Sequence, residues 1–251
     1  ICAITGSKRV GNAMMNSEKW PTSNFRFTPG VTITPIAAGT YTVGSGGNYT
    51  NLNLAFLDLN QRGISGAVTL NLTDAAYNAT PGGGGHYFPL ILGPVVGTSV
   101  SNTITITSSV NPTITFHGSV AGNISTTSSA TGITNAIEPL IALVGTDYTT
   151  VQNMSFVGVN STGPARNVDR GILLSNVTAI DGATNNVIHN VSFNMDRTNT
   201  NTIAIQQNVF TTPTNATGAN SNNTFRNLTI RNTNKGINLL GNATVPDLSC
   251  Q

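Results

Sequence analysis

The sequence is poor in charge, in aromatic side chains and in long apolar runs. Only 8% of its 251 residues are Asp, Glu, Lys or Arg, where an ordinary globular domain has about a quarter. Eleven basic and nine acidic residues give a formal charge of +2, and no basic cluster is present, so nucleic acid is not an expected partner. No apolar run approaches the roughly 20 residues of a transmembrane helix, so we expect no membrane span.

Amides and hydroxyls take the place of the missing charges. The chain contains 33 Asn, 38 Thr, 19 Ser and 26 Gly, while 38% of its residues are apolar, enough to fill a thin repetitive core. This composition favours an extracellular or cell-surface protein. Because the chain starts at Ile1 and carries no signal peptide, we expect a processed piece of a longer secreted protein.

Three six-residue segments align without gaps at a period of 37 residues. They are 151–156, 188–193 and 225–230, and each alternates apolar residues with polar ones. Alternation indicates strands, and a fixed period of 20 to 50 residues indicates a solenoid whose units bury their apolar faces against their neighbours. The repeat therefore predicts an all-β fold, a right-handed parallel β-helix.

One asparagine is identical in all three copies. Because Asn tolerates a left-handed backbone, we interpret Asn153, Asn190 and Asn227 as corner residues that precede a strand and form a ladder of buried amides. On this interpretation Asn190→Ala should destabilise the protein more than Asn186→Ala does.

Further elements are predicted on either side of the repeat. Apolar residues at helical spacing in 51–61 predict a short N-terminal capping helix that closes the first coil. We divide the chain into a lead-in or linker, residues 1–38, and a β-helix domain, residues 39–251. Additional strands are expected at 66–72, 103–107, 112–116, 140–144, 171–175, 202–206 and 235–240.

The opening of the predicted domain resembles a known superfold. Gly39-Thr40-Tyr41-Thr42-Val43-Gly44, the helix, and the strand at 66–72 are similar to the start of secreted right-handed β-helix repeat proteins of the pectate-lyase-like superfold. The resemblance covers residues 39–243. It implies a fold shared by polysaccharide lyases, glycoside hydrolases, adhesins and surface stalks, so function has to be argued from a site.

Two aspartates are the best candidates for a catalytic pair. Asp169 and Asp196 each precede an arginine, Arg170 and Arg197, and lie at the ends of predicted strands in adjacent coils. Glycoside cleavage needs two carboxylates that flank one bond. The alternative, which we favour, is that the two Asp-Arg pairs are local salt bridges that hold corner loops.

Other enzymatic patterns are incomplete. The motifs implied by polygalacturonase-like relatives reduce to Phe116-His117-Gly118, and no cluster of three acids suggests a Ca²⁺ site. We therefore expect no cofactor, no metal and no catalytic residues. Thr-x-Thr runs such as 103–107 suggest ice-binding solenoids, but the 37-residue columns do not align them on successive coils.

The favoured hypothesis is a non-catalytic stalk, adhesin or filament subunit that contacts glycans or like chains, and the alternative is a carbohydrate-active enzyme. Because no capping segment follows Leu240, we expect the stack to continue in a longer protein or to self-associate end to end. We expect no disulfide between Cys2 and Cys250, since several coils should separate them.

Overall fold

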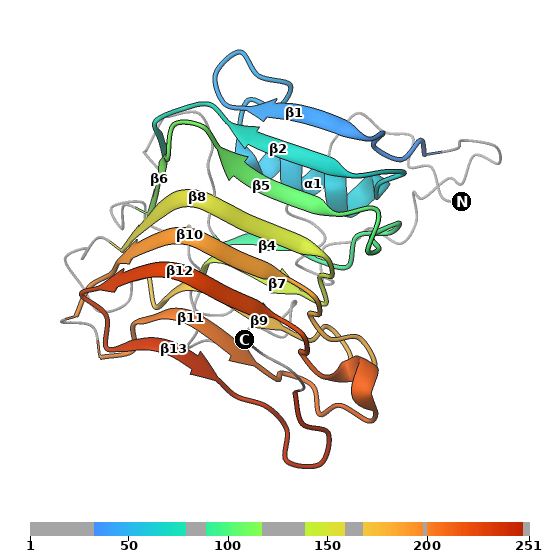
Figure 1. The fold of residues 1–251 in the computed structure, drawn as a ribbon, viewed down its shortest axis with the longest axis vertical. Coiled ribbons are helices and arrows are strands. Elements are labelled where there is room, and N and C mark those ends of the chain that lie inside the picture. Colours follow the sequence, from blue (N-terminus) through green and yellow to red (C-terminus); the bar gives the residue numbers. More distant parts are fainter. Residues whose placement is uncertain (1–32, 79–88, 117–138, 159–167, 198–199, 248–251) are drawn as a thin grey trace, which may run out of the picture.

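The structure is a computed structural model that describes residues 33–78, 89–116, 139–158, 168–197 and 200–247. Within these ranges the chain is predominantly β, contains one α-helix, and pairs its strands in parallel throughout two sheets. Figure 1 shows the larger sheet in front of the smaller one, with strands of successive coils stacked from blue to red. The predicted predominance of parallel β-structure is confirmed.

The larger sheet forms one face of the molecule. Its main path runs β1-β2-β5-β8-β10-β12, and the short strands β3 and β6 extend it at one side, where β6 pairs with both β3 and β8. Its strands are β1 (Gly39–Val43), β2 (Val68–Leu72), β3 (Ala76–Asn78), β5 (Ile104–Ser108), β6 (Thr113–Phe116), β8 (Thr149–Gly158), β10 (Val187–Asn194) and β12 (Thr224–Arg231).

The smaller sheet lies behind the larger one and has the order β13-β11-β9-β7-β4. Nearly all residues of its three central strands are buried. A short apolar strand that is buried on both sides shows no alternation of apolar and polar residues. The strands are β4 (Leu90–Leu92), β7 (Pro139–Val144), β9 (Arg170–Ser175), β11 (Ile203–Asn208) and β13 (Lys235–Leu239).

The 37-residue repeat sets the strand register in the C-terminal half. Ile188 of β10 lies opposite Val151 of β8 and Phe225 of β12, as the alignment predicts. Equivalent apolar side chains consequently stack between the sheets. The rings of Phe156 and Phe193 are nearly parallel, at 13°, with centroids 5.3 Å apart. Such stacking adds to the stabilisation that comes from burying the two rings.

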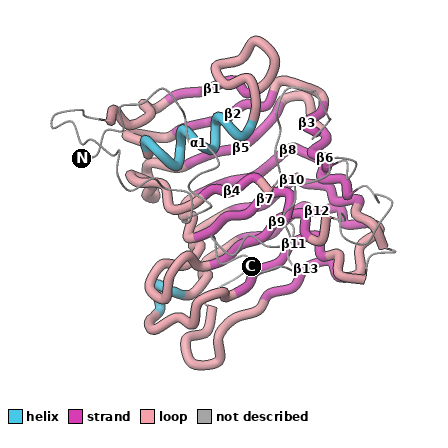
Figure 2. The backbone as a smooth tube through the Cα atoms, turned by 180° about the vertical axis from the view of Figure 1, so that it is seen from behind, coloured by secondary structure: helices cyan, strands magenta, loops and turns pink. Residues whose placement is uncertain are grey.

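The helix α1 (Leu52–Arg62) starts at Asn51, whose side chain accepts a hydrogen bond from the N–H of Leu54, and ends at Gly63, where φ is 65°. It does not lie across the end of the stack as predicted. It lies behind β2 and β5 and beside β4, in the layer of the smaller sheet (Figures 1 and 2). There it supplies the apolar side chains that a strand would supply, from Leu52, Ala55, Phe56 and Leu59.

Asn60 of α1 also makes hydrogen bonds to the backbone near β4, which a neighbouring strand would otherwise make. Asn60 Nδ2 donates to the carbonyl of Ile91, and Asn60 Oδ1 accepts from the N–H of Gly93. These two bonds satisfy backbone groups at the edge of β4. An exposed strand edge invites pairing with another chain, so α1 protects this edge.

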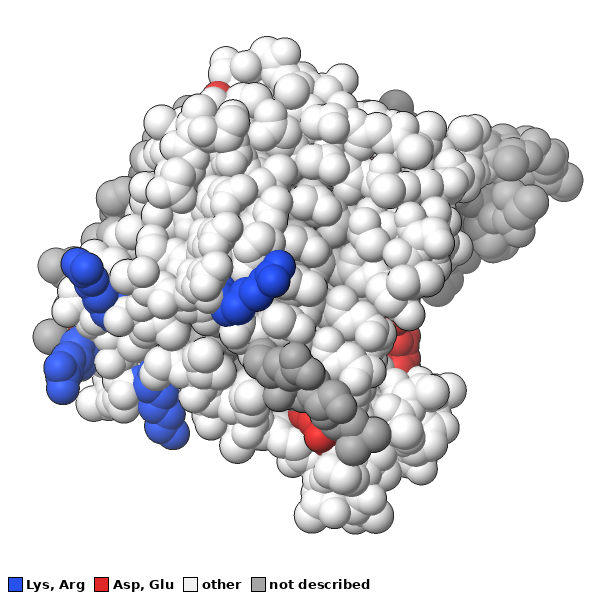
Figure 3. All heavy atoms as spheres, viewed as in Figure 1, with Lys and Arg blue, Asp and Glu red and all other residues white. Residues whose placement is uncertain are grey.

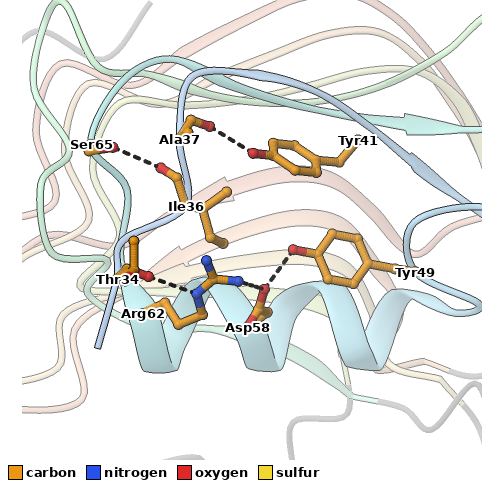
Figure 4. A network of polar contacts seen from close by, with 8 residues as sticks. All are labelled: Thr34, Ile36, Ala37, Tyr41, Tyr49, Asp58, Arg62 and Ser65. Atoms are coloured by element: carbon orange, nitrogen blue, oxygen red, sulfur yellow. Dashed lines mark hydrogen bonds and ion pairs between the residues drawn. The ribbon is translucent and has the colours of Figure 1, made fainter. Parts of the chain in front are cut away.

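The first coil is held by a polar network around the C-terminal half of α1 (Figure 4). Asp58 accepts hydrogen bonds from the Tyr49 hydroxyl at 2.7 Å and from Arg62 at 2.9 Å, and Arg62 also donates to the carbonyl of Thr34. Burial, reinforced by Asp58, raises the pKa of Tyr49. Ile36, which lies in the predicted lead-in of residues 1–38, is buried and bridges to Ile64.

At the opposite end, β12 pairs only with β10, and β13 only with β11, in the described part of the chain. Ile237, Leu239 and Leu240 are each 44% exposed there. Cys2 and Cys250 lie outside the described residues, as does His117, so the structure does not address the expectations for them.

Candidate binding surface

Over its N-terminal strands, the outward face of the larger sheet is covered by hydroxyl and amide side chains. On β2 and β5 the apolar residues point inward, and Thr69, Asn71, Thr105 and Thr107 alternate with them on the outside. Figure 3 views this face. Its Lys and Arg side chains lie in the lower half, over the C-terminal strands, and the region over β1, β2 and β5 is almost free of charge.

A column of threonines crosses four strands of this face in register. Thr40 of β1 pairs with Thr69 of β2, Thr69 with Thr105 of β5, and Thr105 with Thr150 of β8. We call these four residues the threonine column. Val187 of β10 interrupts the series, and Thr224 of β12 follows it.

A second column runs beside the first on the N-terminal strands. Thr42 pairs with Asn71, and Asn71 with Thr107. Thr-x-Thr occurs on β1 and β5, but β2 carries Thr69-x-Asn71 between them, so the pair does not repeat on every coil. The 37-residue period does not reach these strands, and the register of the two columns is visible only in the strand pairing.

The predicted side-chain hydrogen bonds between successive asparagines of the ladder are present. Asn190 Nδ2 donates to Asn153 Oδ1 at 3.5 Å, and Asn227 Nδ2 donates to Asn190 Oδ1 at 3.2 Å. All three residues have positive φ, between 50° and 58°. They lie within long strands, not before them, and Asn190 and Asn227 are exposed. The interpretation of this outer asparagine row as corner residues with buried amides is therefore wrong.

A different set of asparagines is buried at the corners of the coils. Asn186, Asn220 and Asn223 are fully buried, and we call them the inner asparagine row. Asn186 Oδ1 accepts from the N–H of Thr149, and Asn223 Oδ1 accepts from the N–H of Asn186. Each bond joins residues 37 apart in the sequence, so a side chain carries the inter-coil hydrogen bond at the corner where the strands begin.

Asp169 and Arg170 are both 8% exposed, at the start of β9. The Arg170 guanidinium donates to Gln206 Oε1 and to the carbonyls of Asn201 and Asp169. Burial lowers the pKa of Arg170, and the nearby Asp169 opposes this shift. Arg170 thus links β9 by hydrogen bonds to β11 and to the segment that precedes β11.

Asp196 and Arg197 follow β10, and Arg197 is exposed. The main chains of the two candidate aspartates meet the same short segment. The carbonyl of Asp196 accepts from Thr202 Oγ1 at 3.0 Å, and the carbonyl of Asp169 accepts from the N–H of Ile203 at 2.8 Å. The structure therefore brings these residues to one corner through their backbones.

A different pair of acids is coupled electrostatically. Burial raises the pKa of Asp147, although hydrogen bonds from Thr184 work in the opposite direction. Burial also raises the pKa of Asp181, and the charge of Asp147 adds to that effect. The two residues lie in different coils, and no sequence motif joins them, so sequence reasoning did not pair them.

Within the described ranges, no three His, Cys, Asp or Glu residues gather as metal ligands would. In the same ranges, no helix has the length and apolar character of a membrane span. Comparison with known proteins gives no further assignment, because no family model, curated protein or solved structure matches the chain. What the structure defines is a class: a predominantly β protein of two all-parallel sheets whose outer face is almost uncharged over its N-terminal strands.

Proposed function

We propose that the chain is a right-handed parallel β-helix that acts as a non-catalytic adhesion module of a larger secreted or cell-surface protein. One observation carries this proposal: aligned Thr, Ser and Asn side chains recur on the outward face of the larger sheet across successive coils. A stack of parallel strands presents the same side chain at a regular interval of about 4.8 Å, so weak contacts can add up along an extended ligand.

The electrostatics of the face support a neutral ligand. An attractive surface for polyuronates or nucleic acid would carry many Lys and Arg residues. The face over β1, β2 and β5 has almost no charge, and its polar groups can both donate and accept hydrogen bonds (Figure 3). Uncharged glycans on a cell or extracellular matrix have this complementary chemistry.

The competing proposal is a carbohydrate-active enzyme. The corner at Asp169 and Asp196 is the observation in its favour, because the main chains of the two residues contact the adjoining residues Thr202 and Ile203. Against it, Arg170 is already bonded to Gln206 and to two carbonyls, which fits a role in joining strands.

Binding and activity can be separated in one set of experiments. The 251-residue chain should sediment with insoluble neutral polysaccharides and should release neither reducing ends nor unsaturated products from neutral glycans or polyuronates. Retention on polyuronate alone would contradict the proposal. Product release that Asp169→Asn or Asp196→Asn abolishes would establish the enzyme instead.

A further inference from the structure

The four hydroxyls of the threonine column are available to a ligand. Thr40 is exposed, and Thr69, Thr105 and Thr150 are partly exposed. Within the described part of the chain, none of these four side chains takes part in a hydrogen bond. A hydroxyl can donate one hydrogen bond and accept two, so the column presents unused capacity at every strand.

The neighbouring polar columns differ from the threonine column in this respect. Thr42 Oγ1 bonds to Asn48, and Thr107 Oγ1 accepts from both Gln152 and Asn153. The outer asparagine row bonds to itself through its amides. Thr42 and Thr107 already stabilise the stack, whereas every hydroxyl of the threonine column is left for a ligand.

The surroundings of the column restrict the kind of ligand. The outward side chains of β1, β2 and β5 carry no formal charge and include no aromatic ring; they are Thr40, Thr42, Thr69, Asn71, Thr105 and Thr107. Without a ring there is no platform for stacking a single sugar, and without charge there is no attraction for an anionic polymer. The ligand must therefore be uncharged and must repeat along the stack.

We propose that the threonine column binds an extended, uncharged polysaccharide that lies along the stack axis, across the strands. This inference rests on the proposed function and names the site and orientation of the ligand. Each strand contributes one hydroxyl at intervals of about 4.8 Å, so the sugar hydroxyls of one chain can bond to several strands in succession. Because each bond is weak, affinity should require a polymer and should be very low for short oligosaccharides.

Val187 provides a direct test, because it interrupts the column between Thr150 and Thr224. It is partly exposed, so a hydroxyl can replace one methyl group there without disturbing the core. Val187→Thr should join the two parts into a continuous row of six threonines. Thr105→Val, which keeps the shape and removes the hydroxyl, should divide the existing row.

The experiment measures sedimentation of the full chain with insoluble neutral β-glucan and chitin particles. Thr105→Val should weaken retention about fivefold, the effect of one net hydrogen bond, and Val187→Thr should strengthen it. Thr229→Val is the matched control, because Thr229 is exposed on the same sheet face but lies outside the column. Equal thermal midpoints should show that all variants fold.

The outcomes distinguish the site from the function. Polymer binding that neither Thr105→Val nor Val187→Thr changes would overturn the threonine column as the site and leave the proposed function intact. No retention on any polysaccharide would overturn both. If the chain shapes growing ice crystals, and Thr105→Val removes that effect without any polysaccharide binding, the column binds ordered water and the assignment of a glycan is wrong.

Discussion

The inner and outer asparagine rows use the same side chain for different physical purposes. In the inner row, Asn186 and Asn223 are fully buried, and their side-chain oxygens accept backbone N–H groups of the preceding coil. In the outer row, Asn190 and Asn227 are exposed, and their contacts are amide to amide, at 3.2 to 3.5 Å. The inner row satisfies the buried backbone, whereas the outer row occupies positions where φ is positive.

The difference shows what identity within a repeat means. An asparagine recurs in the outer row because few other residues tolerate a left-handed backbone. This restriction on residue type holds even where the side chain is exposed to water. The inner row is irregular in sequence because its members only need to place an acceptor near a corner. Thr149 stands in the column of Asn186 and Asn223, and the related corner contact at Thr184 is made by Asp147.

Among substitutions in the two asparagine rows, Asn186→Ala should lower the free energy of unfolding the most. The substitution removes the acceptor of the Thr149 N–H and the donor to the carbonyl of Thr146, and leaves both backbone groups buried without these partners. At 1 to 3 kcal/mol for each unsatisfied group, we expect a loss of about 3 kcal/mol in the free energy of unfolding. Urea denaturation monitored by circular dichroism measures it.

This expectation reverses the order derived from the repeat, in which Asn190→Ala was the more damaging change. Asn190→Ala in the same titration is the matched control. Equal midpoints for the two variants would show that burial of the inner row adds nothing to stability.

A smaller effect is expected when the outer row is broken. Asn190→Ala should cost about 1 kcal/mol, mainly because alanine is strained at a φ of 53°. Asn190→Gly should then be close to neutral, since glycine adopts this conformation without a steric penalty. If glycine is as damaging as alanine, the amide contacts with Asn153 and Asn227 are the source of stability, and the backbone explanation fails.

The sequence predicted the strands well wherever alternation or the 37-residue period was present. The registers of β8, β10 and β12 follow from aligning three copies of one motif. The position of α1 could not be predicted, because an amphipathic stripe shows that a face is buried and not which layer it faces. The threonine column was missed for a related reason: the lengths of the N-terminal coils are irregular, so only strand pairing reveals its register.

Site chemistry was less predictable than the fold. Adjacent Asp-Arg pairs suggested local salt bridges, but the described hydrogen bonds of Arg170 go to Gln206 and to backbone carbonyls. A buried guanidinium with five N–H donors needs several acceptors, and a sequence neighbour supplies at most a few of them. The coupling of Asp147 to Asp181 depends on how two coils stack, which short-range sequence patterns do not record.

The smallest expected effect on stability is that of replacing Asp147, the acidic residue that accepts hydrogen bonds from Thr184 at a corner. Burial raises the pKa of Asp147 in the folded state above its value in the unfolded chain, so the folded protein holds this proton more tightly. Stability linked to Asp147 is therefore present below the unfolded pKa, near 3.9, and is lost as the pH rises through the folded pKa. Asp147→Asn mimics the protonated form and keeps an oxygen that can accept from Thr184.

We therefore expect Asp147→Asn to remove this pH dependence and to raise the midpoint of urea unfolding at pH 7 by less than the Asn190→Ala change lowers it. It should also lower the pKa of Asp181, because the charge of Asp147 contributes to raising that pKa. A carbon-detected NMR titration of the Asp181 carboxyl measures the second effect. Asp247→Asn is the control: burial also raises the pKa of Asp247, but its charge is not among the causes of the Asp181 shift. A shift of Asp181 that is equal in both variants would mean that its pKa responds to net charge and not to Asp147.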